Sequence, residues 1–222
     1  MAEATLRITS KNYSSWSLRG FLLCRLSGID FAEEQVGAED PRVRAELLLQ
    51  SSSIRMPCLV HDGIEVWDTL AIAEYLNEIR PRARMLPKDR AARARCRSIS
   101  GEMHSGFEAL RASLPMNIRA HRPGFVLWSG PRADIAHILG IWRDCLAAHG
   151  GPWLFGARPT VADAMYAPVV TRFRTYDVRM PDEAMESYCR QVEAWPAMAE
   201  WAAAARQEAD ATIEELEVEA EF

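Results

Sequence analysis

Three short segments of the chain carry groups that could bind or activate a small molecule, and the first is a serine-rich run. It lies between a predicted strand and a predicted helix and comprises Tyr13-Ser14-Ser15-Trp16-Ser17. A hydroxyl at the start of a helix lies where an anion is favoured, so it could donate a hydrogen bond to a bound thiolate. The sequence places no histidine or aspartate beside these serines to activate one as a nucleophile. The commoner role of such serines is to cap the helix.

The other two segments flank a predicted hairpin. Met56-Pro57 stands at the start of a strand, where a proline is tolerated. A cis bond there would leave the backbone N–H and C=O of Met56 free to bind an extended peptide, whereas a trans proline would only begin the strand. Asp68-Thr69 begins a helix and can cap it. The free N–H groups of that first turn could also hold a carboxylate, while Asp68 could pair with an ammonium group.

The elements that must position these segments follow the order β-α-β-α-β-β-α within about 80 residues, a length typical of a small α/β domain. Alternation and helical spacing predict strands at 5–9 and 29–36, helices at 17–27, 41–49 and 69–80, and a hairpin of 58–60 with 64–66. Gly28 is well placed to end the first helix.

After Pro81 the pattern becomes helical throughout. A linker at 82–88 separates the first domain, 1–81, from an all-helical second domain, 89–222. One apolar stripe at helical spacing comprises Ala92, Cys96, Ile99, Met103, Phe107, Leu110 and Leu114. Further helices are predicted at 135–146, from Thr160, and between about 182 and 206, and Pro168 is expected to kink the helix that begins at Thr160.

Composition and charge exclude several classes of protein. The net charge of −5 and pI near 5.6 argue against a general nucleic-acid binder. No stretch reaches the ~18 apolar residues of a membrane helix, and we expect no secretion signal. None of the five cysteines lies within 30 residues of another, which excludes Cys-x-x-Cys and the common zinc spacings and favours a reducing cytoplasm. Residues 208–222 hold seven acidic residues and no basic one, a pattern typical of a solvated face, which predicts either a last exposed helix turn or a disordered segment.

Taken in this order and spacing, these segments resemble the cytosolic glutathione transferase family over nearly the whole chain. The family combines a thioredoxin-like N-terminal domain with an all-helical C-terminal domain. The run Ser51–Val60 resembles the family segment that ends in a cis-proline, and Asp68-Thr69 stands where the family most often has Glu-Ser or Gln-Ser. Thr160-Val161-Ala162-Asp163 resembles the buried capping box of the helical domain, and we interpret it as structural.

The serine run departs from the family pattern in one respect. Ser14-Ser15-Trp16-Ser17-Leu18-Arg19 is similar to the Ser-Ser-Cys-x-x-Arg of the zeta class, with Trp16 in place of the cysteine. The nearest cysteine is Cys24, which we expect to be buried on the helix. Thiol-disulfide exchange through a protein cysteine is therefore not expected.

The resemblance implies glutathione as co-substrate, no metal, and a role for each segment. Ser14 is the expected hydrogen-bond donor to the sulfur, with Ser15, Ser17 or the Trp16 indole as alternatives. Met56 would pair with the cysteinyl backbone of glutathione beside a cis Pro57, and Asp68 and Thr69 would hold its γ-glutamyl end. The glycine carboxylate would bind one of three arginines, Arg55, Arg42 or Arg44.

A small hydrophobic electrophile is expected to bind between the domains, near residues drawn from His104, Phe107, Met116, Asn117 and Tyr166. The resemblance also implies a cytoplasmic homodimer that binds neither nucleic acid nor membrane. Glutathione conjugation is the leading function. The alternatives are a glutathione-dependent cis–trans isomerase of the maleylacetoacetate type, a peroxidase, or a non-catalytic glutathione- or ligand-binding protein.

Overall fold

The computed structural model describes residues 2–37 and 56–208 and contains a four-stranded sheet in the order β2-β1-β3-β4. Strand β1 (Ala4–Ile8) pairs in parallel with β2 (Phe31–Gln35) and antiparallel with β3 (Cys58–His61), which forms a hairpin with β4 (Ile64–Trp67). The hairpin turn uses positive φ angles at Asp62 and Gly63, as this tight connection requires. The predicted strands and hairpin are confirmed.

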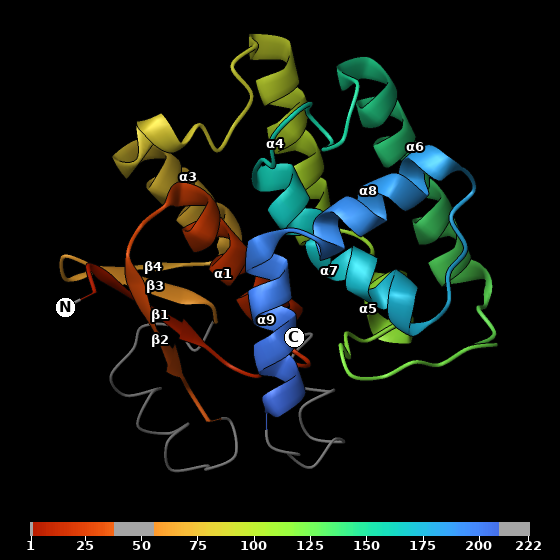
Figure 1. Cartoon of the computed structure of the whole chain (residues 1–222), viewed down its shortest axis with the longest axis horizontal. Coiled ribbons are helices and arrows are strands. Elements are labelled where there is room, and N and C mark those ends of the chain that lie inside the picture. The colour runs from red at the N-terminus through yellow and green to blue at the C-terminus, as the bar shows by residue number, and fades with distance from the viewer. Residues whose placement is uncertain (1, 38–55, 209–222) are drawn as a thin grey trace.

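Helices α1 (Ser15–Ser27) and α3 (Thr69–Ile79) pack against each other on one side of this sheet (Figure 1). Helix α1 ends at Gly28, which adopts the left-handed conformation with φ 71° and donates its N–H to the Arg25 carbonyl. The predicted helix at 41–49 lies outside the described residues.

The rest of the described chain is helical, as predicted. After a short 3-10 turn at Pro81–Ala83 come α4 (Arg90–Ser105), α5 (Glu108–Ser113), α6 (Ser129–His149), α7 (Val161–Thr175), α8 (Glu183–Glu193) and α9 (Pro196–Gln207). Helix α1 packs against both α7 and α9, so the first domain contacts the helical part through the same helix that begins at the serine run (Figure 1). Within the described ranges, no helix is long and apolar enough to cross a membrane.

The apolar stripe from Ala92 to Leu114 is buried along its whole length, but it does not form one helix. Helix α4 ends before Gly106, and Phe107 adopts a left-handed φ of 62° before α5 begins. The carboxylate of Asp134, on α6, accepts a hydrogen bond from the Leu110 N–H at 2.8 Å and so caps α5 from a neighbouring helix. A contact between separate helices therefore stabilises the start of α5.

The predicted capping box at the start of α7 is confirmed. The Thr160 N–H and hydroxyl donate to the Asp163 carboxylate at 2.7 and 2.9 Å, and the Leu154 N–H donates to its other oxygen at 3.1 Å. Burial raises the pKa of Asp163 to about 6, although the hydrogen bonds from these donors lower it. Helix α7 continues through Pro168 to Thr175.

Candidate functional site

The serine run forms a hydrogen-bonded turn at the N-terminus of α1. Ser14 has an extended backbone and caps the helix, because its hydroxyl oxygen accepts the Ser17 N–H at 3.2 Å. The Ser14 hydroxyl donates to the Ser17 hydroxyl oxygen at 2.9 Å, and that oxygen also accepts the Thr9 N–H at 3.1 Å. The turn is thus fixed to the end of β1, with two hydroxyl groups at the positive end of the helix dipole.

The Ser15 hydroxyl lies between two buried arginines. Its oxygen accepts from Arg19 Nη1 at 3.3 Å and from Arg172 Nη2 at 3.4 Å. Each guanidinium is held by a carbonyl, since Arg19 Nε donates to Met165 and Arg172 Nε to Leu114, both at 2.8 Å. Two positive charges therefore lie beside the serine turn, in a region of low dielectric where their field is strong.

The arginine from α7 was not found by sequence reasoning. Arg172 lies 157 residues beyond Ser15, and no local pattern connects the two. Arg19 was noted only as part of the similarity to the zeta-class motif.

Asp68 and Thr69 form a second polar group at the N-terminus of α3. One Asp68 oxygen caps the helix and accepts the N–H groups of Leu70 and Ala71 at 2.9 and 3.1 Å. The other oxygen lies 3.6 Å from His104 Nε2, and the Thr69 hydroxyl lies 3.4 Å from His104 Nδ1. The Asp68 side chain is 40% exposed, so its carboxylate can still accept an ammonium group.

His104 connects these two polar groups across the domains. Its ring packs edge-on against Trp16, with centroids 5.2 Å apart, and the Trp16 ring also lies against the guanidinium groups of Arg19 and Arg111, at 4.4 and 5.2 Å. Burial lowers the pKa of His104, and the charges of Arg19 and Arg111 lower it further, whereas Asp68 raises it. A lowered pKa keeps the ring neutral near pH 7.

Met56-Pro57 has the cis bond that the resemblance implied. Pro57 is buried against α1, where a Cβ added to Gly20 would lie only 2.6 Å from the proline Cγ. Glycine therefore allows the helix that carries the serine turn to approach the proline closely. Arg42, Arg44 and Arg55 lie outside the described residues.

Four residues expected near the electrophile are buried. The Tyr166 hydroxyl donates to the Ile99 carbonyl at 3.2 Å, and burial raises its pKa. The Asn117 amide oxygen accepts from the Asn12 side chain at 3.0 Å, Met116 is 1% exposed, and Phe107 packs against His137. Ser14, at 3% exposure, and Thr69, at 0%, are as buried as these four, so burial alone does not exclude them. We place the proposed electrophile contact at His104 because its ring packs against Trp16, next to the serine turn.

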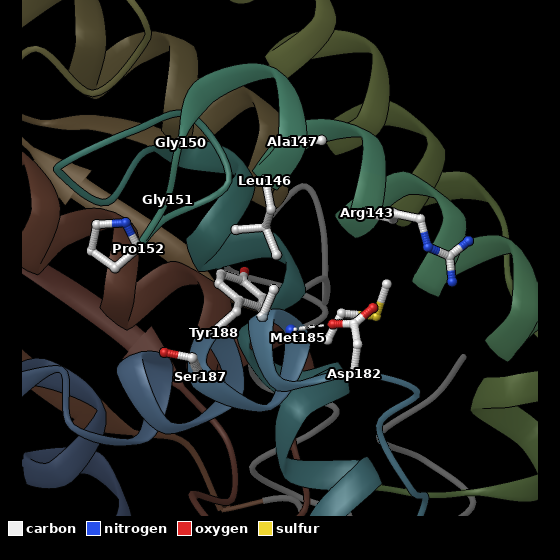
Figure 2. Close-up of a pocket in the computed structure, with 11 residues that line it drawn as sticks. Arg143, Leu146, Ala147, Gly150, Gly151, Pro152, Asp182, Met185, Ser187 and Tyr188 are labelled. Atoms are coloured by element: carbon white, nitrogen blue, oxygen red, sulfur yellow. Dashed lines mark hydrogen bonds between the residues drawn. The ribbon is translucent and has the colours of Figure 1, made fainter.

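A separate pocket of about 500 Å³ lies between α6 and α8. Figure 2 shows Arg143 and Leu146 of α6 facing Met185 and Tyr188 of α8. None of the predicted site residues lines it, so it is distinct from the serine turn. Among the residues that the structure describes, no three His, Cys, Asp or Glu side chains come together as a metal site.

Family models match both parts of the chain. Residues 13–79 match the N-terminal domain of glutathione S-transferase, and residues 128–204 match its C-terminal domain. The chain belongs to the glutathione S-transferase family. The predicted family, fold class and glutathione-dependent enzymatic function are thereby confirmed.

Relatives and solved structures agree with this assignment. The chain is 26% identical to a probable maleylacetoacetate isomerase of Caenorhabditis elegans over 70% of its own length and 72% of that protein. It is 31% identical to maleylacetoacetate isomerase of Rattus norvegicus over 56% of each.

Two solved transferases show the same fold. A glutathione transferase homolog from Burkholderia, solved with bound glutathione, superposes with a TM-score of 0.69 at 22% identity and covers 94% of this chain and 100% of that one. Glutathione S-transferase 1-6 of Anopheles dirus gives 0.71 at 17% identity, covering 91% and 95%.

Proposed function

We propose that this transferase binds glutathione along its first domain and ionises the thiol at the serine turn for attack on a small hydrophobic electrophile. The observation that carries the proposal is the proximity of two groups with complementary roles. Asp68-Thr69 offers a carboxylate and a hydroxyl for a zwitterionic amino-acid end, and Trp16 and His104 connect it to a hydroxyl-rich helix N-terminus.

Glutathione would extend from α3 to α1 past Met56. The outward oxygen of Asp68 pairs with the α-ammonium, the Thr69 hydroxyl with the α-carboxylate, and the Met56 backbone with the cysteinyl unit. Arg55, Arg42 or Arg44 remains the proposed partner of the glycine carboxylate. This orientation directs the sulfur toward the serine turn.

Ionisation of the thiol is the chemical task of the serine turn. A free thiol has a pKa near ~8.5, and only the thiolate is a strong nucleophile. In the complex the Ser14 hydroxyl turns from Ser17 to donate to the sulfur, because a hydrogen bond to an anion is stronger than one to a neutral oxygen. The helix dipole and the charges of Arg19 and Arg172 favour the same anion. The thiol proton leaves to solvent, and a sulfur lone pair forms the bond to the electrophilic carbon. The bond broken at that carbon gives its electron pair to the leaving group, which is chloride for chlorodinitrobenzene.

The electrophile is proposed to bind against Trp16 and His104, at the contact between the proposed domains 1–81 and 89–222, which the linker 82–88 joins. A homodimer in the cytoplasm remains part of the proposal. All five cysteines are buried and free, which supports a reducing compartment. Arg97 pairs with Glu74 of its own chain, so other arginines of α4 would have to meet a partner subunit.

Glutathione-dependent isomerisation is the second candidate, favoured by the similarity to maleylacetoacetate isomerases. In that reaction the thiolate adds to a cis double bond and leaves after rotation, so glutathione is not consumed. Trp16 in place of the motif cysteine distinguishes the chain from the zeta-class pattern.

Parallel assays separate the candidates. Chlorodinitrobenzene, maleylacetone and cumene hydroperoxide are offered with glutathione, and we expect conjugation of the first. If maleylacetone is the one substrate of the three that is turned over, the proposed function is isomerase rather than transferase. Retention on glutathione resin without turnover of any of the three would instead indicate a non-catalytic binding protein.

A further inference from the structure

The carboxylate of Glu208, just after α9, lies against the loop that precedes the serine turn. One oxygen accepts the Lys11 N–H and Gln35 Nε2, both at 2.8 Å. The other accepts the Ser10 hydroxyl at 2.8 Å and the Asn12 N–H at 2.9 Å. The sequence pattern assigned Glu208 to a solvated acidic run, whereas here four donors surround its carboxylate.

This loop leads directly into the N-cap of α1. The Ser10 hydroxyl oxygen accepts the N–H groups of Asn12 and Tyr13 at 3.1 and 3.0 Å, and the Ser14 N–H donates to the Ser10 carbonyl at 3.2 Å. Glu208 therefore holds the residue, Ser10, around which the whole turn up to Ser14 is folded.

Other contacts attach the same loop to the helical part of the chain. The Trp201 indole of α9 donates to the Lys11 carbonyl at 2.8 Å. The Asn12 side chain donates to Asn117 Oδ1 at 3.0 Å and accepts the Arg119 N–H at 3.0 Å, while the Arg119 guanidinium donates to the Glu208 carbonyl at 2.9 Å and so holds Glu208 beside the loop. Of these contacts, only the Glu208 side chain brings a negative charge to the loop N–H groups.

We propose that Glu208 is a positioning residue that fixes the β1–α1 loop and thereby the Ser14 hydroxyl in the place from which it donates to the glutathione sulfur. The inference rests on the proposed role of Ser14. It adds that the end of α9, in the helical domain, controls thiol ionisation in the first domain. Glu208 can fix the loop because hydrogen bonds from N–H groups to a carboxylate are roughly twice as strong as those to a neutral acceptor.

Glu208→Gln tests this with little change of size. Each oxygen of the Glu208 carboxylate accepts two hydrogen bonds. In either orientation of the glutamine amide, its NH2 group replaces one of these oxygens and faces two donors, so two of the four hydrogen bonds are lost. Glu208→Ala removes all four bonds. Glu200→Gln is the matched control, since Glu200 lies on α9, which ends directly before Glu208, and contacts α1 through Arg25, away from the loop.

The first measurement does not depend on glutathione. Amide hydrogen exchange of the full chain should show Lys11 and Asn12 exchanging about tenfold faster or more in both Glu208 variants, while amides in the middle of α1 and all amides of Glu200→Gln keep wild-type rates. Unchanged exchange at Lys11 and Asn12 in Glu208→Ala would overturn the inference.

The second measurement follows the ultraviolet absorbance of bound thiolate against pH. We expect its pKa to rise by about half to one unit in Glu208→Gln, equivalent to a three- to tenfold slower conjugation near neutral pH, with little change in KM for glutathione. If the wild type lowers the thiol pKa but Glu208→Gln titrates identically, the positioning role is wrong and the proposed function stands. If the wild type itself binds glutathione without lowering its pKa, the proposed function fails, and the role of Glu208 fails with it.

Discussion

Ser14→Ala should slow conjugation strongly near neutral pH while costing little stability. The Ser14 oxygen accepts the Ser17 N–H at 3.2 Å and the Ser14 hydroxyl donates to the Ser17 oxygen at 2.9 Å, so the substitution loses an N-cap and one neutral hydrogen bond, together worth about 1–2 kcal/mol. In the complex its hydrogen bond to the thiolate is worth roughly 1.5–3 kcal/mol. At ~1.4 kcal/mol per unit, the pKa of the bound thiol should rise by about one to two units. Conjugation at pH about 6.5–7 should then fall roughly ten- to a hundredfold.

Ser15→Ala is the matched comparison because the adjacent hydroxyl has a different environment. Its oxygen accepts from two buried guanidinium groups, and removing a partner of a buried charged donor costs roughly 1.5–3 kcal/mol. We therefore expect Ser15→Ala to melt at a lower temperature than Ser14→Ala but to keep more of its activity per folded molecule.

The assay is a pH–rate profile with chlorodinitrobenzene for both variants, beside thermal melting. The deficit of Ser14→Ala should shrink as the pH passes the raised pKa, because the thiolate then forms unaided. If the Ser14→Ala profile overlays the wild type and that of Ser15→Ala shifts to high pH, Ser15 is the donor. If neither profile shifts, the serines act only as caps and the reasoning is refuted.

Three further changes test other parts of the structure. Glutathione affinity should weaken as the pH falls below the ordinary histidine pKa of 6.5, because protonated His104 competes with the glutathione ammonium for Asp68. Calorimetry across that pH range should give a constant affinity for His104→Gln, and a wild-type affinity that is also constant would contradict this. Burial raises the pKa of Asp163 from 3.8 to about 6, so the stability that its protonation contributes is complete below about pH 3.8 and is lost, ~3 kcal/mol in all, as the pH rises through about 6. Between pH about 5 and 7.5, urea unfolding should show about 1.4 kcal/mol of this loss in the wild type but not in Asp163→Asn, and a wild type that is more stable at pH about 7.5 would contradict this sign. Gly20→Ala should lower the free energy of unfolding by about 1–3 kcal/mol, because its methyl group would lie 2.6 Å from the Pro57 ring. An unchanged midpoint of urea unfolding would show that the ring can shift without a cost in stability.

The parts of the fold that the sequence predicted are those governed by neighbouring residues. Gly28 ends α1 because it can adopt a left-handed backbone, and Thr160 with Asp163 caps α7 across three residues. The break at Phe107 was not predictable in this way, since the side chain that caps α5 is Asp134 of another helix.

The same distinction between contacts of neighbouring residues and contacts of distant ones applies to the candidate site. Ser14, Asp68 and Pro57 belong to short motifs and could be proposed from the sequence. The contact of Arg172 with Ser15 and that of Glu208 with the loop join residues more than 150 positions apart, and only the packing of α7 and α9 against the first domain brings them together. The helical stripe likewise predicted burial for Phe107 but gave no means of telling a core residue from a pocket residue.

The measurement that tests the central claim most directly is the pH titration of glutathione bound to the wild-type protein, followed by the absorbance of its thiolate. With Ser14 donating to the sulfur at the end of α1, and Arg19 and Arg172 beside it, the bound thiol should titrate at or below about pH 7, more than one unit under the free value of ~8.5. A bound thiol that titrates at the free value would contradict the assignment of the serine turn as the site of thiol activation.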